Sequence, residues 1–365
     1  MREIRLEKSV EGKKKTREIL MTHCQQYSSL KIQDIFKFLY QSSFGCEHLV
    51  SDLDSVVARI RRESEESCVQ NENLLDSLDG DYSRVHLSYL NQGLSVETLG
   101  QIFVKSAKNE PDGMRVLENK LHVAEELVRE HMIPFSFEDW NATQEEWKKS
   151  GYPAIHHSEF FRKTYHPAYR VVSNKFIPFL PLFAKIDKML KTQSVIVAIE
   201  GGSASGKTTL SKMLEEFYDC TVLHMDDFFL RPEQRTPERF TEVGGNVDRE
   251  RFLKEVLLPL SENKPILYRR FDCATFAFCD PIKIIPKKLT IVEGAYSMHP
   301  ELASYYDLSV FLDIDSELQK KRIERRNSPE MAKRFFEEWI PLEKIYFSKM
   351  EVEQRCDISI ASENN

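Results

Sequence analysis

The first half of the chain carries apolar residues at helical spacing. They recur three or four positions apart in three stretches, Ile32–Leu39, Leu49–Ile60 and Met114–Val128. This spacing places each set on one face of a helix. Two pairs of polar residues, Ser51 with Asp54 and Thr143 with Glu146, are typical of helix starts. Residues 1–190 are therefore predicted to be mostly α-helical, and no alternating strand pattern is visible in them.

From about residue 190 the pattern changes to short apolar runs separated by helical stretches. The apolar runs are Ser194–Glu200, Thr221–His224, Leu289–Val292 and Leu308–Leu312. The helical stretches are Thr208–Tyr218, Arg249–Leu260 and Leu318–Arg326. Alternating strands and helices predict an α/β fold with a parallel sheet covered by helices. A helix expected over Phe176–Lys191 joins the two halves, so the predicted domains are residues 1–190 and 191–365.

Composition removes several classes of function. The net charge of the 365 residues is 51 − 58 = −7, so no basic field attracts nucleic acid or an anionic membrane. The seven cysteines are odd in number and form no C-x-x-C pair, which favours a reducing cytoplasm over a disulfide scaffold or zinc ribbon. No apolar run approaches the roughly 18 residues of a membrane span, and the charged N-terminus is unlike a signal peptide.

A glycine-rich segment between a predicted strand and a predicted helix matches the phosphate-binding pattern G-x-x-x-x-G-K-[ST]. Its residues are Gly201, Gly202, Ser203, Ala204, Ser205, Gly206, Lys207 and Thr208, followed by Thr209. Small residues let consecutive N–H groups converge on one phosphate, and the following helix adds its positive dipole end. Lys207 is expected to reach the β- and γ-phosphates and Thr208 to bind Mg²⁺, so the segment predicts binding of a nucleoside triphosphate.

Carboxylates follow two of the predicted strands at the edge where open α/β sheets bind ligands. Asp226 and Asp227 end one strand, and Glu293 ends another. Adjacent side chains in extended structure point opposite ways, so one aspartate faces the substrate. Asp226 is favoured as the base, Asp227 is the alternative, and an acidic helix start is the simpler explanation of both. Glu293 is expected beside Mg²⁺, unless it is an ordinary strand-end glutamate.

The motifs GGSASGKTT, HMDDFF, GGNVD, YRRFDC, VEGAYSMHP and FLDID with RIERRN lie within residues 192–361. In this order they resemble the uridine kinase and phosphoribulokinase family of P-loop kinases, and in particular bacterial proteins called uridine-kinase-like. The resemblance implies a five-stranded parallel core, ATP and Mg²⁺, and phosphoryl transfer to a sugar or alcohol hydroxyl. It also implies that Asp226 is the catalytic base and Glu293 the residue on the magnesium side.

The acceptor side of the resemblance is less complete. Asp248 matches the position of an aspartate that holds ribose hydroxyls in uridine kinases, and Tyr268, Asp227 and Asp272 are assigned to the same side. The histidine that helps those enzymes to recognise the base is absent after Tyr268, and DDFF is similar to nicotinamide riboside kinases. The acceptor therefore stays open between a uridine- or cytidine-like nucleoside and another riboside, pantothenate, a sugar or a small alcohol.

Three arginines lie on one predicted helix. Arg322, Arg325 and Arg326 are three and four residues apart, so they share a face and could cover a phosphate as the family's mobile lid does. Arg322 and Arg326 are taken as catalytic candidates, and a solvated charged face is the alternative. We expect a small hydroxyl acceptor as partner, with a homo-oligomer allowed. A nucleotide-gated binding module with incidental turnover is the second hypothesis.

One histidine-containing segment of the first half has no distinctive spacing. His156, His157, Glu159 and His166 do not follow a metal-ligand pattern. The role of residues 1–190 is left open.

Overall fold

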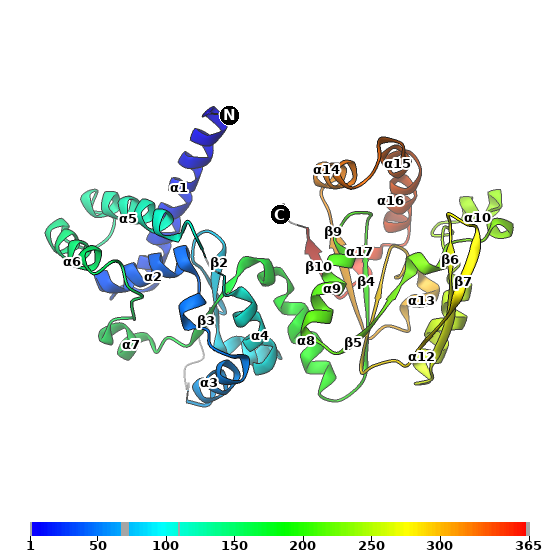
Figure 1. Cartoon of the computed structure of the whole chain (residues 1–365), viewed down its shortest axis with the longest axis horizontal. Helices are drawn as coiled ribbons and strands as arrows, with labels where there is room; N and C mark the ends of the chain where they lie inside the picture. The colour runs from blue at the N-terminus through cyan, green and yellow to red at the C-terminus, as the bar shows by residue number, and fades with distance from the viewer. Residues whose placement is uncertain (1, 67–72, 109, 363–365) are drawn as a thin grey trace. The chain divides into compact units, whose positions relative to one another are not determined.

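The computed structural model describes residues 2–66, 73–108 and 110–362. The chain forms two compact units, Met1–Leu180 and Pro181–Asn365 (Figure 1). The domain boundary near residue 190 stays a prediction. No helix in the described part of the chain has both the length and the apolar character needed to cross a membrane.

The N-terminal unit is mostly helical, as predicted. Its helices are α1 (Arg2–Gln26), α2 (Ile32–Phe44), α3 (Leu53–Glu66), α4 (Val96–Ser106), α5 (Gly113–Arg129), α6 (Phe137–Lys149) and α7 (Glu159–Tyr165). The two predicted helix starts were wrong, one by a single residue and the other by seven. Asp52, not Ser51, accepts the N–H of Ser55 at the start of α3. Ser136 accepts the N–H of Asp139 at the start of α6, and Thr143 lies inside that helix.

This unit also contains an antiparallel sheet that the pattern did not predict. Its strands are β1 (Leu75–Ser77), β2 (Tyr82–His86) and β3 (Tyr169–Ser173), in the order β1-β2-β3. All five residues of β2 are buried, so this strand has no exposed face to produce polar and apolar alternation. β1 has only three residues and is too short to show a period.

The C-terminal unit is built on the predicted α/β sheet. Five parallel strands lie in the order β10-β9-β4-β8-β5. Their bounds are β4 (Val195–Gly201), β5 (Cys220–His224), β8 (Leu289–Glu293), β9 (Leu308–Asp313) and β10 (Ile358–Ala361). The first four confirm the predicted runs, and β10 was not found by pattern because it has four residues. Figure 1 shows helices on both sides of this sheet.

The helices of this unit follow the predicted stretches and add several. They are α8 (Leu180–Leu190), α9 (Lys207–Phe217), α10 (Pro237–Thr241), α11 (Arg249–Phe252), α12 (Leu258–Ser261), α13 (Pro300–Ala303), α14 (Ser316–Arg326), α15 (Pro329–Arg334), α16 (Ile340–Lys349) and α17 (Val352–Arg355). A π-helical segment, Leu253–Leu257, connects α11 to α12. A hairpin of β6 (Ile266–Asp272) and β7 (Ala277–Ile284) forms a separate antiparallel ribbon.

Strand register brings the predicted functional segments together. Glu293, the last residue of β8, pairs with Ile199 of β4 on one side and with His224 of β5 on the other. Because parallel strands end at the same edge, the glycine-rich turn after β4, the aspartates after β5 and the carboxylate of β8 are neighbours. The central strands β4 and β8 are buried, so packing holds in place the sheet edge at which they end.

Candidate active site

The glycine-rich turn has the backbone of a phosphate-binding loop. Three residues have positive φ angles, Gly201 at 146°, Ala204 at 63° and Gly206 at 107°. A Cβ atom on Gly201 would lie 2.5 Å from the carbonyl oxygen of Leu312, so no side chain fits there. The turn leads from β4 directly into α9, which begins at Lys207. The predicted order of strand, turn and helix is therefore confirmed.

Two buried side chains from distant helices hold this loop. Glu343 of α16 accepts the N–H of Ser203 at 2.9 Å and its hydroxyl at 2.7 Å. Gln319 of α14 donates to the carbonyl oxygen of Ser203 at 2.8 Å. All three polar groups of Ser203 are thus bonded. Sequence reasoning missed both residues, because more than a hundred positions separate them from the loop and neither belongs to a motif.

A buried carboxylate lies directly before the loop. Glu200 accepts hydrogen bonds from the N–H groups of Gly201 at 2.9 Å, Tyr296 at 3.2 Å and Met298 at 3.0 Å. The hydroxyl of Tyr346 on α16 also donates to it, at 3.1 Å. Glu200 is fully buried, and this burial raises its pKa to about 7. Glu200 therefore ties the loop, the segment after β8 and α16 to one another.

Lys207 and Thr208 open α9 beside the loop. The Lys207 ammonium group donates to the carbonyl oxygens of Gly201 at 2.8 Å and Gly202 at 2.9 Å. The Thr208 hydroxyl donates to Oε1 of Glu293 at 3.2 Å. These contacts place one cationic group, one hydroxyl and one carboxylate around the N-terminus of α9.

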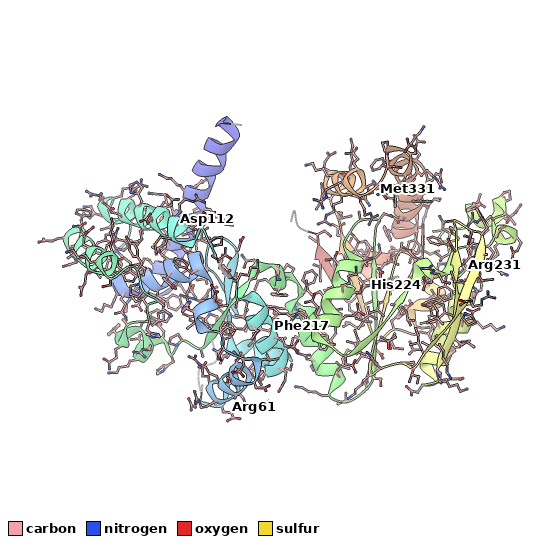
Figure 2. The ribbon with its side chains drawn as sticks, viewed as in Figure 1. Arg61, Asp112, Phe217, His224, Arg231 and Met331 are labelled. Atoms are coloured by element: carbon pink, nitrogen blue, oxygen red, sulfur yellow. The ribbon has the colours of Figure 1, made fainter. Side chains whose placement is uncertain are left out.

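Glu293 also contacts His224, which ends β5 and is labelled in Figure 2. The Nδ1 atom of His224 lies 2.7 Å from Oε1 of Glu293. This hydrogen bond raises the pKa of His224, whereas the His224 and Thr208 contacts hold the pKa of Glu293 below its usual value despite burial. Hydroxyl and carboxylate oxygens are donors that Mg²⁺ prefers, so Thr208 and Glu293 fit a magnesium site.

The two aspartates lie in a 3₁₀-helical turn, Met225–Phe228, directly after β5, so the predicted extended backbone was wrong and the simpler expectation of an acidic helix start describes their backbone. Their surroundings differ. Asp226 is exposed, and Lys207 and Glu293 are both near enough to influence it. Partial removal from water by the walls of the site raises the pKa of Asp226, Lys207 opposes this rise and Glu293 adds to it. Asp227 is half-buried, and its Oδ2 atom accepts a hydrogen bond from Tyr268 at 2.8 Å. Asp226 is therefore within electrostatic range of Lys207 and Glu293, whereas Asp227 is hydrogen-bonded to Tyr268.

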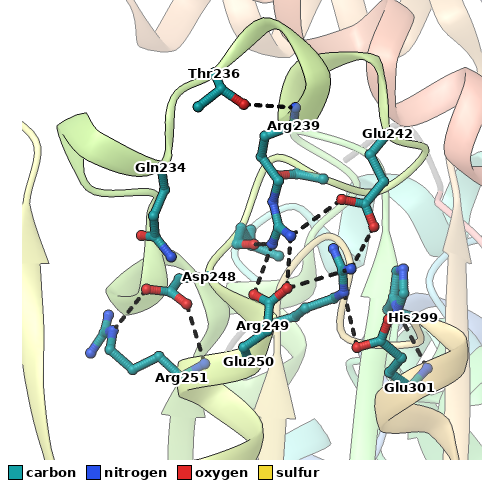
Figure 3. A network of polar contacts seen from close by, with 12 residues as sticks. Gln234, Thr236, Arg239, Glu242, Asp248, Arg249, Glu250, Arg251, His299 and Glu301 are labelled. Atoms are coloured by element: carbon teal, nitrogen blue, oxygen red, sulfur yellow. Dashed lines mark hydrogen bonds and ion pairs between the residues drawn. The ribbon is translucent and has the colours of Figure 1, made fainter.

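Asp248 lies in a network of charged residues between β5 and β6 (Figure 3). It is almost fully buried, accepts the N–H of Arg251 at the start of α11 and lies 3.6 Å from Nε of Arg231. Arg239 holds the same segment through the carbonyl oxygens of Gly245 and Val247. The structure thus gives Asp248 a capping role, and its contact with an acceptor stays a prediction.

Tyr268 is the third residue of β6 and Asp272 is its last. Tyr268 is buried and its ring stacks on Phe228 at 5.2 Å, while its hydroxyl bonds Asp227. Asp272 accepts the N–H of Ala274 at 2.8 Å and so shapes the turn of the hairpin. Tyr268 is therefore next to the predicted base motif, whereas Asp272 has a local structural partner.

The arginines of α14 separate into two groups. Arg322 is half-buried and donates to the carbonyl oxygen of Ala204 in the loop at 3.1 Å. Arg326 is exposed and lies 5.7 Å from the ring of Phe335. Of the two catalytic candidates, Arg322 is the one in direct contact with the phosphate-binding loop.

Comparison with known proteins agrees with this geometry. Residues 196–334 match the phosphoribulokinase / uridine kinase family. The chain is 30% identical over 145 residues to uridine kinase from Borrelia duttonii, covering 38% of this chain and 68% of the relative. It is 30% identical over 141 residues to uridine kinase from Oceanobacillus iheyensis, covering 36% of this chain and 66% of that protein.

Solved structures are more distant. A possible uridine kinase from Bacillus stearothermophilus is similar with 21% identity and a TM-score of 0.37, over 49% of this chain and 98% of that one. A putative fructose transport system kinase from Silicibacter is similar with 20% identity and a TM-score of 0.38, over 46% of this chain and 90% of that one. The family match lies within the C-terminal unit. Through this unit, the chain belongs to the phosphoribulokinase / uridine kinase family of P-loop kinases.

Proposed function

We propose that the C-terminal unit transfers the γ-phosphoryl group of ATP to a hydroxyl group of a uridine- or cytidine-like nucleoside or a related small metabolite. One observation carries this proposal. Asp226 lies at the sheet edge where the electrostatic influence of Lys207 and Glu293 reaches it, next to a loop with the backbone of a phosphate site. A protein that only binds nucleotide has no need for a positioned base.

The proposed roles follow from what each side chain can do. N–H groups of the loop bind the phosphates, and Lys207 turns from its loop carbonyls to the β- and γ-phosphates. Asp226 accepts the proton of the acceptor hydroxyl. The oxygen of that hydroxyl attacks the γ-phosphorus. The bond from this phosphorus to the oxygen bridging it to the β-phosphate breaks, and ADP leaves. Mg²⁺ bound by Thr208 and Glu293 would neutralise charge on the phosphate oxygens.

The acceptor site is proposed beside Asp226, with Asp227 and Tyr268 as its nearest residues. The hydrogen bond between these two side chains fixes the orientation of Asp227. Arg322, which already contacts the loop, is proposed as the arginine that stabilises charge on the transferring group. The family also supports a cytoplasmic site of action, where ATP is supplied, and cell fractionation would test this location.

A panel of acceptors tests the function. The full chain is incubated with MgATP and uridine, cytidine, nicotinamide riboside, pantothenate or simple sugars, and products are identified by mass. We expect one class to gain a phosphoryl group. Asp226→Asn should lower kcat by about 10²- to 10⁴-fold, the range of general-base catalysis, with ATP affinity unchanged.

Lys207→Ala should abolish transfer without unfolding the protein, whereas Lys212→Ala, an exposed lysine on the same helix, should have no effect. Full activity of Lys207→Ala would refute the assignment. ATP hydrolysis that needs no acceptor and is stimulated by a protein partner would favour the nucleotide-gated module instead.

A further inference from the structure

Helix α2 of the N-terminal unit buries a polar face. Asp34, Lys37 and Gln41 are spaced i, i+3 and i+7, so they line one side of the helix, and each is at most 8% exposed. Opposite them, Arg84 of β2 is completely buried. Helices normally bury apolar stripes and expose charged residues, so a buried polar stripe that meets a buried arginine indicates a functional site.

The first carboxylate of this layer has all its oxygens occupied. Oδ1 of Asp34 accepts the N–H of Ser158 at 2.8 Å and lies 3.1 Å from Nδ1 of His157. Oδ2 accepts the Ser158 hydroxyl at 2.7 Å and the N–H of Lys31 at 3.0 Å. These donors are backbone, hydroxyl and imidazole groups, so Asp34 forms no ion pair with Arg84 or Lys37.

The second carboxylate is occupied in the same way. Asp76 of β1 is the cross-strand partner of Arg84, yet no ion pair within 4 Å joins them. Its Oδ2 atom accepts the hydroxyl of Tyr27 at 3.1 Å and lies 2.8 Å from Nε2 of His86. Its Oδ1 atom accepts the amide of Gln26 at 3.1 Å. The formal charges of the two carboxylates balance Arg84 and Lys37, but their oxygens are bonded elsewhere.

Arg84 keeps an unused donor. Its Nε and Nη2 atoms donate to the amide oxygen of Gln41 at 3.1 and 2.8 Å, and its guanidinium lies over the ring of Tyr169 at 4.6 Å. Among the described residues, Nη1 of Arg84 has no hydrogen-bond partner. A buried guanidinium without an ion pair is costly, and its planar fork is suited to oxyanions.

A second unused polar atom lies close by. His23 of α1 is 3% exposed, and its Nε2 atom has no partner within the described parts of the chain. Its ring is 4.3 Å from the ring of Phe38, over which the Arg84 guanidinium lies at 5.4 Å. Burial lowers the pKa of His23, and Arg84 contributes to this. An anion beside Arg84 would reverse that effect.

Basic groups continue from this centre to the surface. The Lys37 ammonium group donates to the carbonyl oxygen of Ile155 at 3.3 Å, and burial with the charge of Arg84 lowers its pKa to about 8. The exposed His48 has its pKa lowered by partial burial and by Lys37 and His156. No group of three or more His, Cys, Asp or Glu residues in the described chain could hold a metal ion. The cationic groups of Arg84 and Lys37 favour an anion as the partner.

We propose that this layer, centred on Arg84, is a binding site for a small oxyanion, either a phosphate group or a carboxylate. Both oxygens of each carboxylate already accept other hydrogen bonds, while Arg84 has a donor without an acceptor beside an unpartnered ring nitrogen of His23, so the missing partner is rich in acceptors. Lys37 is within electrostatic range of both Arg84 and the exposed His48. This site lies within the N-terminal unit and does not depend on the proposed kinase activity.

Histidine NMR signals of the full chain can test the site, because they distinguish it from the phosphate-binding loop. The protein is titrated with inorganic phosphate and, separately, with malonate, and the signals of His23, His157 and His224 are assigned by single His→Gln variants. We expect saturable shifts of His23 and His157 with at least one anion, and a rise in the pKa of His23. The anion that causes these shifts shows whether the site binds a phosphate group or a carboxylate.

Two variants at Arg84 sharpen the result. Arg84→Gln should weaken anion binding at His23 at least about tenfold, the effect of losing a charge-assisted hydrogen bond, and Arg84→Lys should weaken it less. Lys207→Ala should leave the His23 response unchanged. If Arg84→Gln fails to fold, Lys37→Gln replaces it, with weaker binding expected.

The proposal is overturned if His23 and His157 do not respond to either anion, or if only His224 responds. It is also overturned if the His23 response survives in a folded Arg84→Gln protein. An unchanged far-UV circular dichroism spectrum of the Arg84 and Lys37 variants controls for loss of the fold of the mostly helical N-terminal unit.

Discussion

Replacement of the buried Glu200 by glutamine should change how the stability of the C-terminal unit depends on pH. The pKa of Glu200 is raised from its ordinary 4.5 to about 7 because the side chain is fully buried. The folded state therefore resists ionisation of this group. Stability is highest below pH 4.5, where Glu200 is neutral in both states, and is lost as the pH rises through about 7.

The size of the effect follows from these two values. At about 1.4 kcal/mol per pKa unit, the difference corresponds to a loss of about 3 kcal/mol across the window, as an order of magnitude. Tyr296, Tyr306, Tyr346 and Cys356, which lie near Glu200, all have pKa values raised well above this window. Asp226 and Glu343 also have raised pKa values, so the wild-type curve contains their contributions too.

Hydrogen exchange is the suitable assay because it reports on one unit at a time. Protection of peptides covering β4 and β8 is measured from pH 4.5 to 7.5 and corrected for the intrinsic exchange rate. Wild type should lose about 3 kcal/mol more than Glu200→Gln over this window. Glu324→Gln, an exposed carboxylate on α14, is the matched control and should follow wild type. Equal slopes in wild type and Glu200→Gln would refute the reasoning.

Three further predictions concern the loop and the acceptor side. Gly201→Ala places Cβ 2.5 Å from a backbone carbonyl oxygen at a φ of 146°, so the affinity for ATP, measured by titration, should fall at least about tenfold. In Gly202→Ala the new Cβ meets a side-chain amide at 3.2 Å, so the loss of affinity should be smaller. Equal affinities of the two variants would contradict this prediction. Tyr268→Phe removes one hydrogen bond and should raise the KM of the acceptor about three- to tenfold with the KM of ATP unchanged, and an effect on ATP alone would oppose the placement. Arg322→Ala should lower kcat by about 10³-fold and Arg326→Ala far less, whereas the reverse order in steady-state kinetics would assign the lid role to Arg326.

The local parts of the site could be predicted from sequence because their signals are contiguous. Strand, glycine-rich turn and helix follow one another within 195–217, Asp226 lies two residues after the end of β5, and Glu293 is the last residue of β8. Parallel strand order then brings these ends together without further information. Glu200 also had a visible signal, since a charged residue ends the apolar run before the loop.

The residues that hold the loop could not be predicted in the same way. Glu343 and Gln319 contact Ser203 across more than a hundred residues, and neither lies in a recognisable pattern. The sheet of the N-terminal unit was missed because β2 is buried on both faces. The polar layer around Arg84 could not be predicted for a related reason. Charged residues are expected at the surface, whereas Asp34 and Arg84 occupy buried positions of a helix and a strand.

A crystal structure with a non-hydrolysable ATP analogue, Mg²⁺ and the acceptor found in the panel would test the proposed chemistry most directly. We predict the triphosphate along the N–H groups of 201–208, with Lys207 on its terminal phosphate and the Asp226 carboxylate facing the acceptor hydroxyl. Nucleotide bound elsewhere, or Asp226 turned away from the acceptor with another group in its place, would contradict the account.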